Sequence, residues 1–121
     1  MTSGVWRIRL SGAAERDIAD ILRATRDRFG TRQLGVYRVT LLEALRALGE
    51  GPGVAGSVGR DEIFAGLRSL HVARGRRRGR HFIMYRVVED DMIEIVRVLH
   101  DGMELAGHIP GPDGGSGVYG G

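Results

Sequence analysis

Apolar residues are most concentrated between residues 80 and 109, and their pattern there predicts a β-hairpin. Two runs, residues 81–88 and 92–99, are rich in Val, Ile, Tyr and Phe, which favour strands. The acidic residues 89–91 that separate them suit a tight turn. Neither run alternates cleanly between apolar and polar positions. Both faces of the hairpin therefore need cover from other parts of the chain.

A strict alternation near the N-terminus predicts a further strand over residues 5–10. Trp6, Ile8 and Leu10 fall on one face of this segment, and arginines occupy the other. Because only one face is apolar, we expect this strand to lie at an edge of the sheet.

Two amphipathic helices are predicted to follow. Over residues 14–29 apolar side chains recur at steps of three and four, with Ser11 as a candidate N-cap. Gly30 suits the C′ position because it accepts a left-handed backbone, and Thr31 is then expected to cap a second helix that ends at Gly49. So short a connection predicts an antiparallel helical hairpin.

The remaining segments are shorter. Residues 50–59 have the glycine and proline density of a loop, residues 67–73 are expected to form a strand, and residues 101–106 a short helix or turn. Residues 110–121 are so rich in glycine that a disordered tail is expected.

This order of elements predicts an α+β fold. Residues 1–109 are expected to form one domain, in which the helical hairpin packs on one face of a mainly antiparallel sheet. No predicted helix covers the other face, apart from the short segment near residues 101–109. An exposed apolar face of this kind indicates a binding site for a partner.

All 18 basic residues are arginine, which gives a pI of about 10.1 although the formal net charge is only +3. Genomic base composition is one explanation. Five of the arginines lie within residues 74–80, RGRRRGR, a segment too charged to be buried and therefore expected to project from the sheet. Three roles stay open for it: contact with nucleic-acid phosphates, contact with an acidic protein segment, or no specific role.

Several kinds of site are not expected. The chain has no cysteine, which excludes disulfides and thiolate metal ligands, and its four histidines lack metal-ligand spacing. Residues 50–59 hold no basic residue that would make them a phosphate-binding loop, so no cofactor is expected. The sequence shows no secretory or membrane-spanning segment, which favours a cytoplasmic location without membrane contact.

Segments in a fixed order resemble the ParE branch of the RelE/ParE toxins of type II toxin–antitoxin systems. They are residues 13–18, 29–30, 66–68, 82–86 and 95–100, together with Met103. The resemblance spans about residues 5–109. It implies an N-terminal strand, a helical hairpin and a three-stranded antiparallel meander. It also implies a toxin that inhibits DNA gyrase by protein–protein binding. Its partner would be a cognate antitoxin, ParD-like or another small acidic protein, in a hetero-oligomer.

The related RelE toxins are ribosome-dependent endoribonucleases. The alternative function that the resemblance implies is therefore cleavage of messenger RNA on the ribosome. The positions that match their catalytic residues hold Arg68, Leu70, Phe82, His100 and Met103 here. Most of the catalytic set is therefore absent, which favours a non-enzymatic toxin. The enzyme alternative would rely on Arg68 and His100, assisted by Tyr85 or by an arginine of residues 74–80. A third reading is a weakened relative that serves mainly in the repressor complex.

Partner binding is the more favoured role for the candidate residues. Arg97 interrupts an apolar strand, where an unpaired guanidinium would be costly, so it is expected to meet Glu94, Asp101 or a carboxylate of the partner. His100 lies at the end of the same predicted strand. The candidate partner-binding residues are Arg68, Arg76, Arg77, Arg78, Arg97, His100 and Met103.

Overall fold

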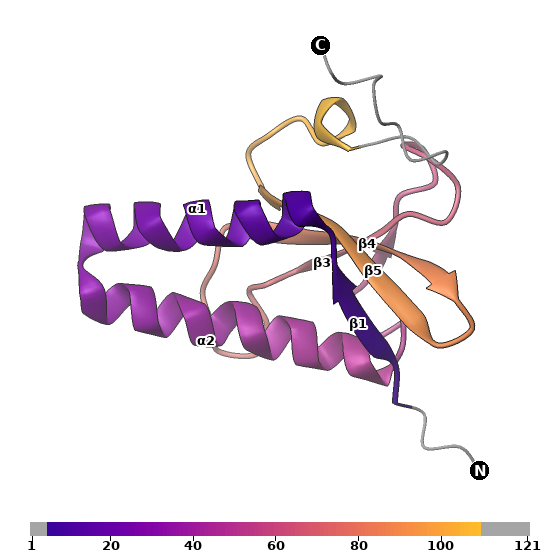
Figure 1. Cartoon of the computed structure of the whole chain (residues 1–121), viewed down its shortest axis with the longest axis horizontal. Helices are drawn as coiled ribbons and strands as arrows, with labels where there is room; N and C mark the ends of the chain where they lie inside the picture. The colour runs from indigo at the N-terminus through magenta and orange to yellow at the C-terminus, as the bar shows by residue number, and fades with distance from the viewer. Residues whose placement is uncertain (1–4, 110–121) are drawn as a thin grey trace.

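The computed structural model describes residues 5–109, which form the predicted α+β fold (Figure 1). The proposed tail, 110–121, lies outside the described residues. In chain order the strands and helices are β1 (Arg7–Leu10), α1 (Gly12–Phe29), α2 (Thr31–Ala47), the 3-10 helix η1 (Leu48–Glu50), β2 (Val58–Gly59), β3 (Arg68–His71), β4 (His81–Glu89), β5 (Met92–His100) and the 3-10 helix η2 (Ala106–His108).

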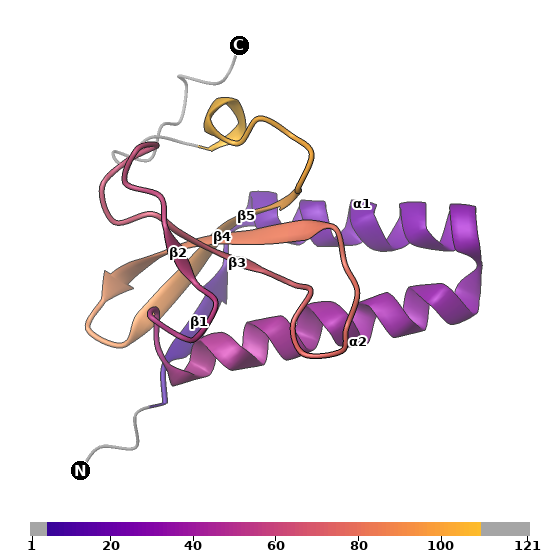
Figure 2. The ribbon, with the colours of Figure 1, turned by 180° about the vertical axis from the view of Figure 1, so that it is seen from behind.

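The sheet has the strand order β1-β5-β4-β3-β2 (Figure 2). β1 pairs in parallel with β5, and the other pairs are antiparallel. The edge position of the first strand and the β3–β4–β5 meander are therefore confirmed. β2 was not predicted, because a two-residue strand within a glycine-rich loop shows no apolar alternation.

The helices form the predicted antiparallel hairpin, whose tip extends beyond the sheet (Figure 1). Ser11 caps α1, since its hydroxyl accepts the Ala14 N–H at 3.0 Å. The prediction that Thr31 caps α2 is wrong. Gly30, with a φ of 95°, ends α1 and starts α2 by itself, so Thr31 is already the first helical residue.

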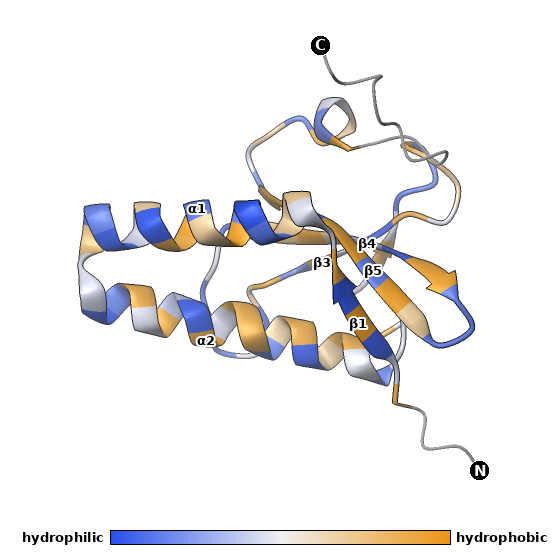
Figure 3. Ribbon diagram, viewed as in Figure 1, coloured by the Kyte–Doolittle hydropathy of each residue, from blue (hydrophilic) through white to orange (hydrophobic). Residues whose placement is uncertain are grey.

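The larger core lies between the helical hairpin and one face of the sheet. The sheet contributes the buried side chains of Ile83, Tyr85 and Ile95 to this core. Leu41 of α2 and Leu48 of η1 are buried opposite them. Figure 3 shows the corresponding apolar stretches on the central strands and along the helices. Trp6, Ile8 and Leu10 pack against this core, as their alternation predicted.

The expectation of an open apolar sheet face is wrong for the described residues. A second, smaller core covers that face, where Met84, Val96 and Leu99 of the strands pack with Leu67 and Ile109. The covering residues come from turns and from the segment around η2. These segments lack the periodicity by which helices and strands are predicted.

No helix within residues 5–109 is long and apolar enough to cross a lipid bilayer.

Candidate partner-binding site

Residues 74–80, here called the arginine loop, are held at both ends. Arg74 Nη1 donates to the Ala55 carbonyl at 2.7 Å, and the Arg80 N–H donates to the Tyr37 hydroxyl of α2 at 3.0 Å. Gly79 packs so closely that a Cβ there would lie 2.4 Å from Val72 Cγ2. The loop is exposed at residues 75–78, as predicted, but it is tied down at both ends and does not project freely from the sheet. Arg74 is bound to the loop after η1 and Arg80 to α2, and residues 75–78 lie between these two fixed points.

The centre of the loop carries three arginines without partners. Arg76, Arg77 and Arg78 are exposed, and within residues 5–109 their side chains make no hydrogen bond or ion pair. Arg46 on α2, by contrast, is paired with Glu43 at 2.9 Å. Three consecutive guanidinium groups on a fixed turn are positioned to meet carboxylates or phosphates from outside.

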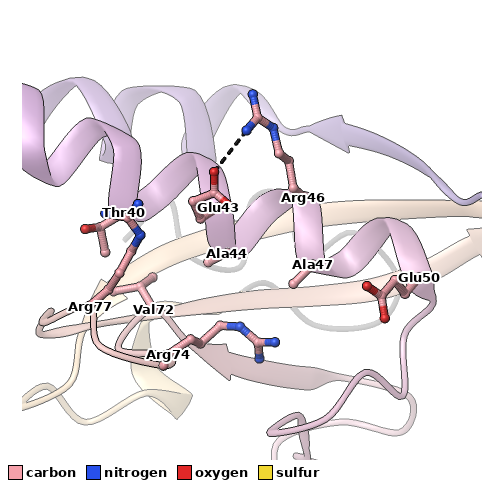
Figure 4. Close-up of a pocket in the computed structure, with 10 residues that line it drawn as sticks. Thr40, Glu43, Ala44, Arg46, Ala47, Glu50, Val72, Arg74 and Arg77 are labelled. Carbon is pink, nitrogen blue, oxygen red and sulfur yellow. Dashed lines mark hydrogen bonds and ion pairs between the residues drawn. The ribbon is translucent and has the colours of Figure 1, made fainter.

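A groove runs between α2 and the arginine loop. It consists of two adjoining clefts, of about 350 and 560 Å³, which share Thr40, Arg74 and Arg77. In Figure 4 Arg77 lies alongside α2 near Thr40, while Arg74 extends below Ala47. The other residues that line the groove are Gln33, Val36, Tyr37, Glu43, Ala44, Arg46, Ala47, Glu50, Val72, Gly75, Arg76 and Arg78.

The helix contributes one continuous stripe to this groove. Gln33, Val36, Thr40, Ala44 and Ala47 recur at steps of three and four, so they lie on one side of α2. Apart from Gln33, these side chains are small or apolar, and Val36 is 44% exposed. One wall of the groove is thus mainly uncharged, and the opposite wall is cationic.

Arg97 is engaged by a partner that sequence reasoning did not name. Asp17 of α1 accepts from Arg97 Nε at 2.7 Å and from Nη2 at 2.8 Å, and it also accepts the Val98 N–H at 2.9 Å. This hydrogen bonding raises the pKa of the Arg97 guanidinium. The expected partners are wrong, because Glu94 binds Arg86 and Asp101 binds His71.

The residues of the enzyme alternative do not converge. Arg68 and Tyr85 are paired across β3 and β4, but both donate to the carbonyl of Pro52, and Tyr85 is fully buried. His100 pairs with His81, four positions along β4 from Tyr85 and therefore about 13 Å away along the strand. Arg68 and Tyr85 fix the loop after η1, and His100 lies near the other end of the sheet.

His100 and Met103 lie close to the end of the arginine loop. The Asp101 N–H donates to the Arg80 carbonyl at 2.7 Å, and Arg80 Nε lies 3.4 Å from the Asp101 carboxylate. The His100 side chain is 48% exposed, and Met103 is 38% exposed. Of the predicted residues, Arg76–Arg78, His100 and Met103 are thus available at the surface, whereas Arg68 and Arg97 serve internal contacts.

A cluster of histidines beside the loop was missed, because its members are far apart in the sequence. The Tyr37 hydroxyl lies 2.7 Å from His81 Nδ1, and the His81 ring packs edge-on against His100 at 5.4 Å between centroids. His71 binds Asp101 at 2.9 Å, and this hydrogen bond lowers the pKa of Asp101. Burial, reinforced by the charge of His100, lowers the pKa of His81 to about 4.

This shift makes a testable prediction about acid stability. Between pH 6.5, the ordinary pKa of His81, and pH 4, the unfolded chain binds a proton that the native state excludes. Stability should therefore fall as the pH drops through this window, by about 1 kcal/mol at pH 5 because His81 is only partly buried. Urea unfolding at pH 7.5, 6 and 5 measures the loss.

The matched variants for that series are His81→Gln and His108→Gln. The first should flatten the dependence between pH 7.5 and 5, whereas the second should retain it, because His108 lies outside the cluster. An unaltered slope in His81→Gln contradicts the assignment to this imidazole.

Comparison with known proteins identifies the family of this chain. Residues 8–105 match the family model described as ParE toxin of type II toxin–antitoxin system, parDE. The chain belongs to this ParE toxin family. A ParE1 toxin of Mycobacterium tuberculosis is 33% identical over 99 residues, which cover 82% of this chain and 93% of that protein. The resemblance inferred from the sequence is therefore confirmed.

Solved structures confirm the fold of this ParE-family chain. A structure titled as the chromosomal ParDE toxin–antitoxin system from P. aeruginosa matches with a TM-score of 0.63 at 18% identity, covering 81% of this chain and 98% of the other. The toxin–antitoxin complex RelBE2 from M. tuberculosis matches with a TM-score of 0.52 at 22% identity, covering 79% and 98%. The shared architecture is the α+β arrangement described above.

Proposed function

We propose that this ParE-type toxin inhibits DNA gyrase by binding it, stalls the enzyme with its DNA cleaved, and is neutralised by a cognate antitoxin in a hetero-oligomeric complex. Membership of the ParE family supports the toxin role. The two structural neighbours named above come from a ParDE system and from a RelBE2 complex, which supports an antitoxin partner. The proposed setting is the cytoplasm, where gyrase and its DNA are found.

The observation that favours binding over catalysis is the state of the candidate catalytic residues. Arg68 and Tyr85 are both committed to the Pro52 carbonyl. His100 is too far along the sheet to act with them. The exposed Arg76, Arg77 and Arg78, with His100 and Met103 nearby, offer instead a surface for a partner. Arg97 and Arg68 are engaged instead in internal contacts, with Asp17 and with the loop after η1.

A supercoiling assay tests the proposal. Addition of the purified protein to gyrase, relaxed plasmid and ATP should lower the supercoiling rate at least tenfold. Treatment with detergent and protease should then release linear DNA, because a stalled gyrase holds both strands cut. Relaxation of the same plasmid by topoisomerase I should be unaffected, which controls for non-specific DNA binding by a chain with a pI of about 10.1.

The same preparation distinguishes the alternatives. Full supercoiling at saturating protein, together with messenger RNA cut on translating ribosomes, would transfer the function to the ribonuclease reading. If neither activity is found and expression without an antitoxin leaves growth unchanged, the weakened-relative reading gains support.

A further inference from the structure

We propose that the groove between α2 and the arginine loop binds an amphipathic acidic segment of the neutralising antitoxin. Carboxylates of that segment would pair with Arg76, Arg77 and Arg78, and apolar side chains would contact Val36. The physiological identity of the partner rests on the proposed function. The kind of peptide that the groove binds does not depend on that function, because it follows from the lining residues alone.

Charge complementarity identifies the occupant as acidic. Within residues 5–109, Arg76–Arg78 are the cationic side chains of the groove that have no hydrogen-bond or ion-pair partner, and Glu50 is the one unpaired carboxylate in the lining. A guanidinium group binds a carboxylate through two parallel hydrogen bonds, and each of the three arginines on this turn can do so. Carboxylates of a partner would therefore supply the negative charges that no residue within 5–109 supplies to these three arginines.

The opposite wall makes the occupant amphipathic and favours a peptide over a nucleic acid. Val36 exposes apolar surface, and Ala44 and Ala47 form a smooth floor with Val72. Glu43 and Glu50 also line the groove, so carboxylates of the segment should face the arginine loop and not this part of the α2 wall. The one aromatic residue in the lining, Tyr37, packs its ring against His81 and uses its hydroxyl for His81 and Arg80, so no free platform for base stacking is present.

The length of the groove sets the length of the segment. The α2 stripe from Gln33 to Ala47 spans about 21 Å at 1.5 Å per residue. A helical segment of about 14 residues, or an extended one of about six, covers this distance. Both ends of the arginine loop are already fixed, so binding orders little additional backbone and loses little entropy.

The probe that tests this inference is a synthetic 16-residue helical peptide with glutamates along one side and leucines along the other. Titrated into the ¹⁵N-labelled full chain at low salt, it should shift amide signals of residues 33–47 and 74–80. Signals of Arg7 and Asp91, at the far turn of the sheet, should stay unchanged. A peptide with lysine at every glutamate position should produce no shifts.

Two matched pairs of variants assign the contacts. R76E/R77E/R78E should weaken peptide binding at least tenfold and flatten its dependence on salt, whereas R16E/R23E/R28E makes the same charge change on exposed positions of α1 and should weaken it less than threefold. Val36→Asn should weaken binding about threefold to tenfold. Leu42→Asn should not, because Leu42 is equally exposed at 44% but lies on another side of α2.

Several outcomes overturn the inference. They are the absence of shifts at millimolar peptide, shifts confined to other surfaces, equal losses in the two arginine triple variants, or tight binding of single-stranded RNA or duplex DNA at the loop in place of the peptide. Unchanged melting temperatures in all variants verify that they fold. The supercoiling assay with wild-type protein is independent of these results. Failure of the gyrase proposal and failure of the groove proposal can therefore be told apart.

Discussion

Replacing Asp17 with alanine is expected to lower the free energy of unfolding by about 3 kcal/mol. Asp17 and Arg97 retain only 14% and 25% of their side-chain exposure, so the variant leaves a largely buried guanidinium without its counter-charge. It also removes the acceptor for the Val98 N–H. β1 cannot replace that acceptor, because its pairing with β5 ends at Leu10 opposite Ile95.

Chemical denaturation of Asp17→Ala and Asp20→Ala measures this effect against a control on the same helix. Asp20 forms an ion pair with Arg23, but both side chains are more than half exposed, so its loss should cost less than about 0.5 kcal/mol. Asp17→Asn separates charge from hydrogen bonding, since the amide can still accept from Val98. Equal destabilisation by the Asp17 and Asp20 variants would show that the buried pair is not the source of the effect.

The Asp17–Arg97 pair illustrates what the sequence could not supply. The two residues are 80 positions apart, and the apolar pattern around Arg97 indicates only that an acid must be close. Local acids such as Glu94 were the natural expectation. The actual choice depends on where α1 lies against the part of β5 beyond the end of β1, which is a property of the tertiary fold.

Features with a local signal were predicted well. Three- and four-residue periodicity located both helices, and the alternation at Trp6, Ile8 and Leu10 located the edge strand. The Ser11 cap was also predicted, because an N-cap needs only one side chain and the N–H groups that follow it. In each case the physical cause lies within a few residues of the element that it determines.

The second core had no such signal. Leu67 and Ile109 are fully buried, yet they belong to irregular segments in which apolar residues recur without a period. Their burial follows from long-range packing on Met84 and Leu99. The face that was predicted to be open is therefore covered, and the proposed partner site lies in the groove beside α2 and not on the sheet.

Some features of the candidate site could be predicted from the sequence, and others could not. The composition of residues 74–80 indicated an exposed charged segment whose role stayed open, and the resemblance to ParE toxins indicated the type of protein. Neither indicated that Tyr37 holds the loop against α2, or that Arg68 and Tyr85 share one carbonyl acceptor. These contacts decide which cations are free to bind, and they join parts of the chain that the sequence places far apart.

Gly79→Ala should test whether the fixed position of the arginine loop matters, with a loss of about 2 kcal/mol in the free energy of unfolding. The added Cβ would lie 2.4 Å from Val72 Cγ2 and 3.0 Å from the Tyr37 hydroxyl. Val72 is buried, and the Tyr37 hydroxyl is held by His81 and Arg80, so neither can retreat. The loop must move away from α2 instead.

Thermal and urea unfolding of Gly79→Ala, with Gly53→Ala as the control, separate this clash from a general effect of replacing glycine. A Cβ at Gly53 meets no atom within 4 Å, and its φ is not positive, so that variant should change stability by less than about 1 kcal/mol. Gly79→Ala should also weaken binding of the acidic peptide although every arginine is retained. If the clash is absorbed without loss of stability or affinity, the arginines act independently of the loop's position beside α2.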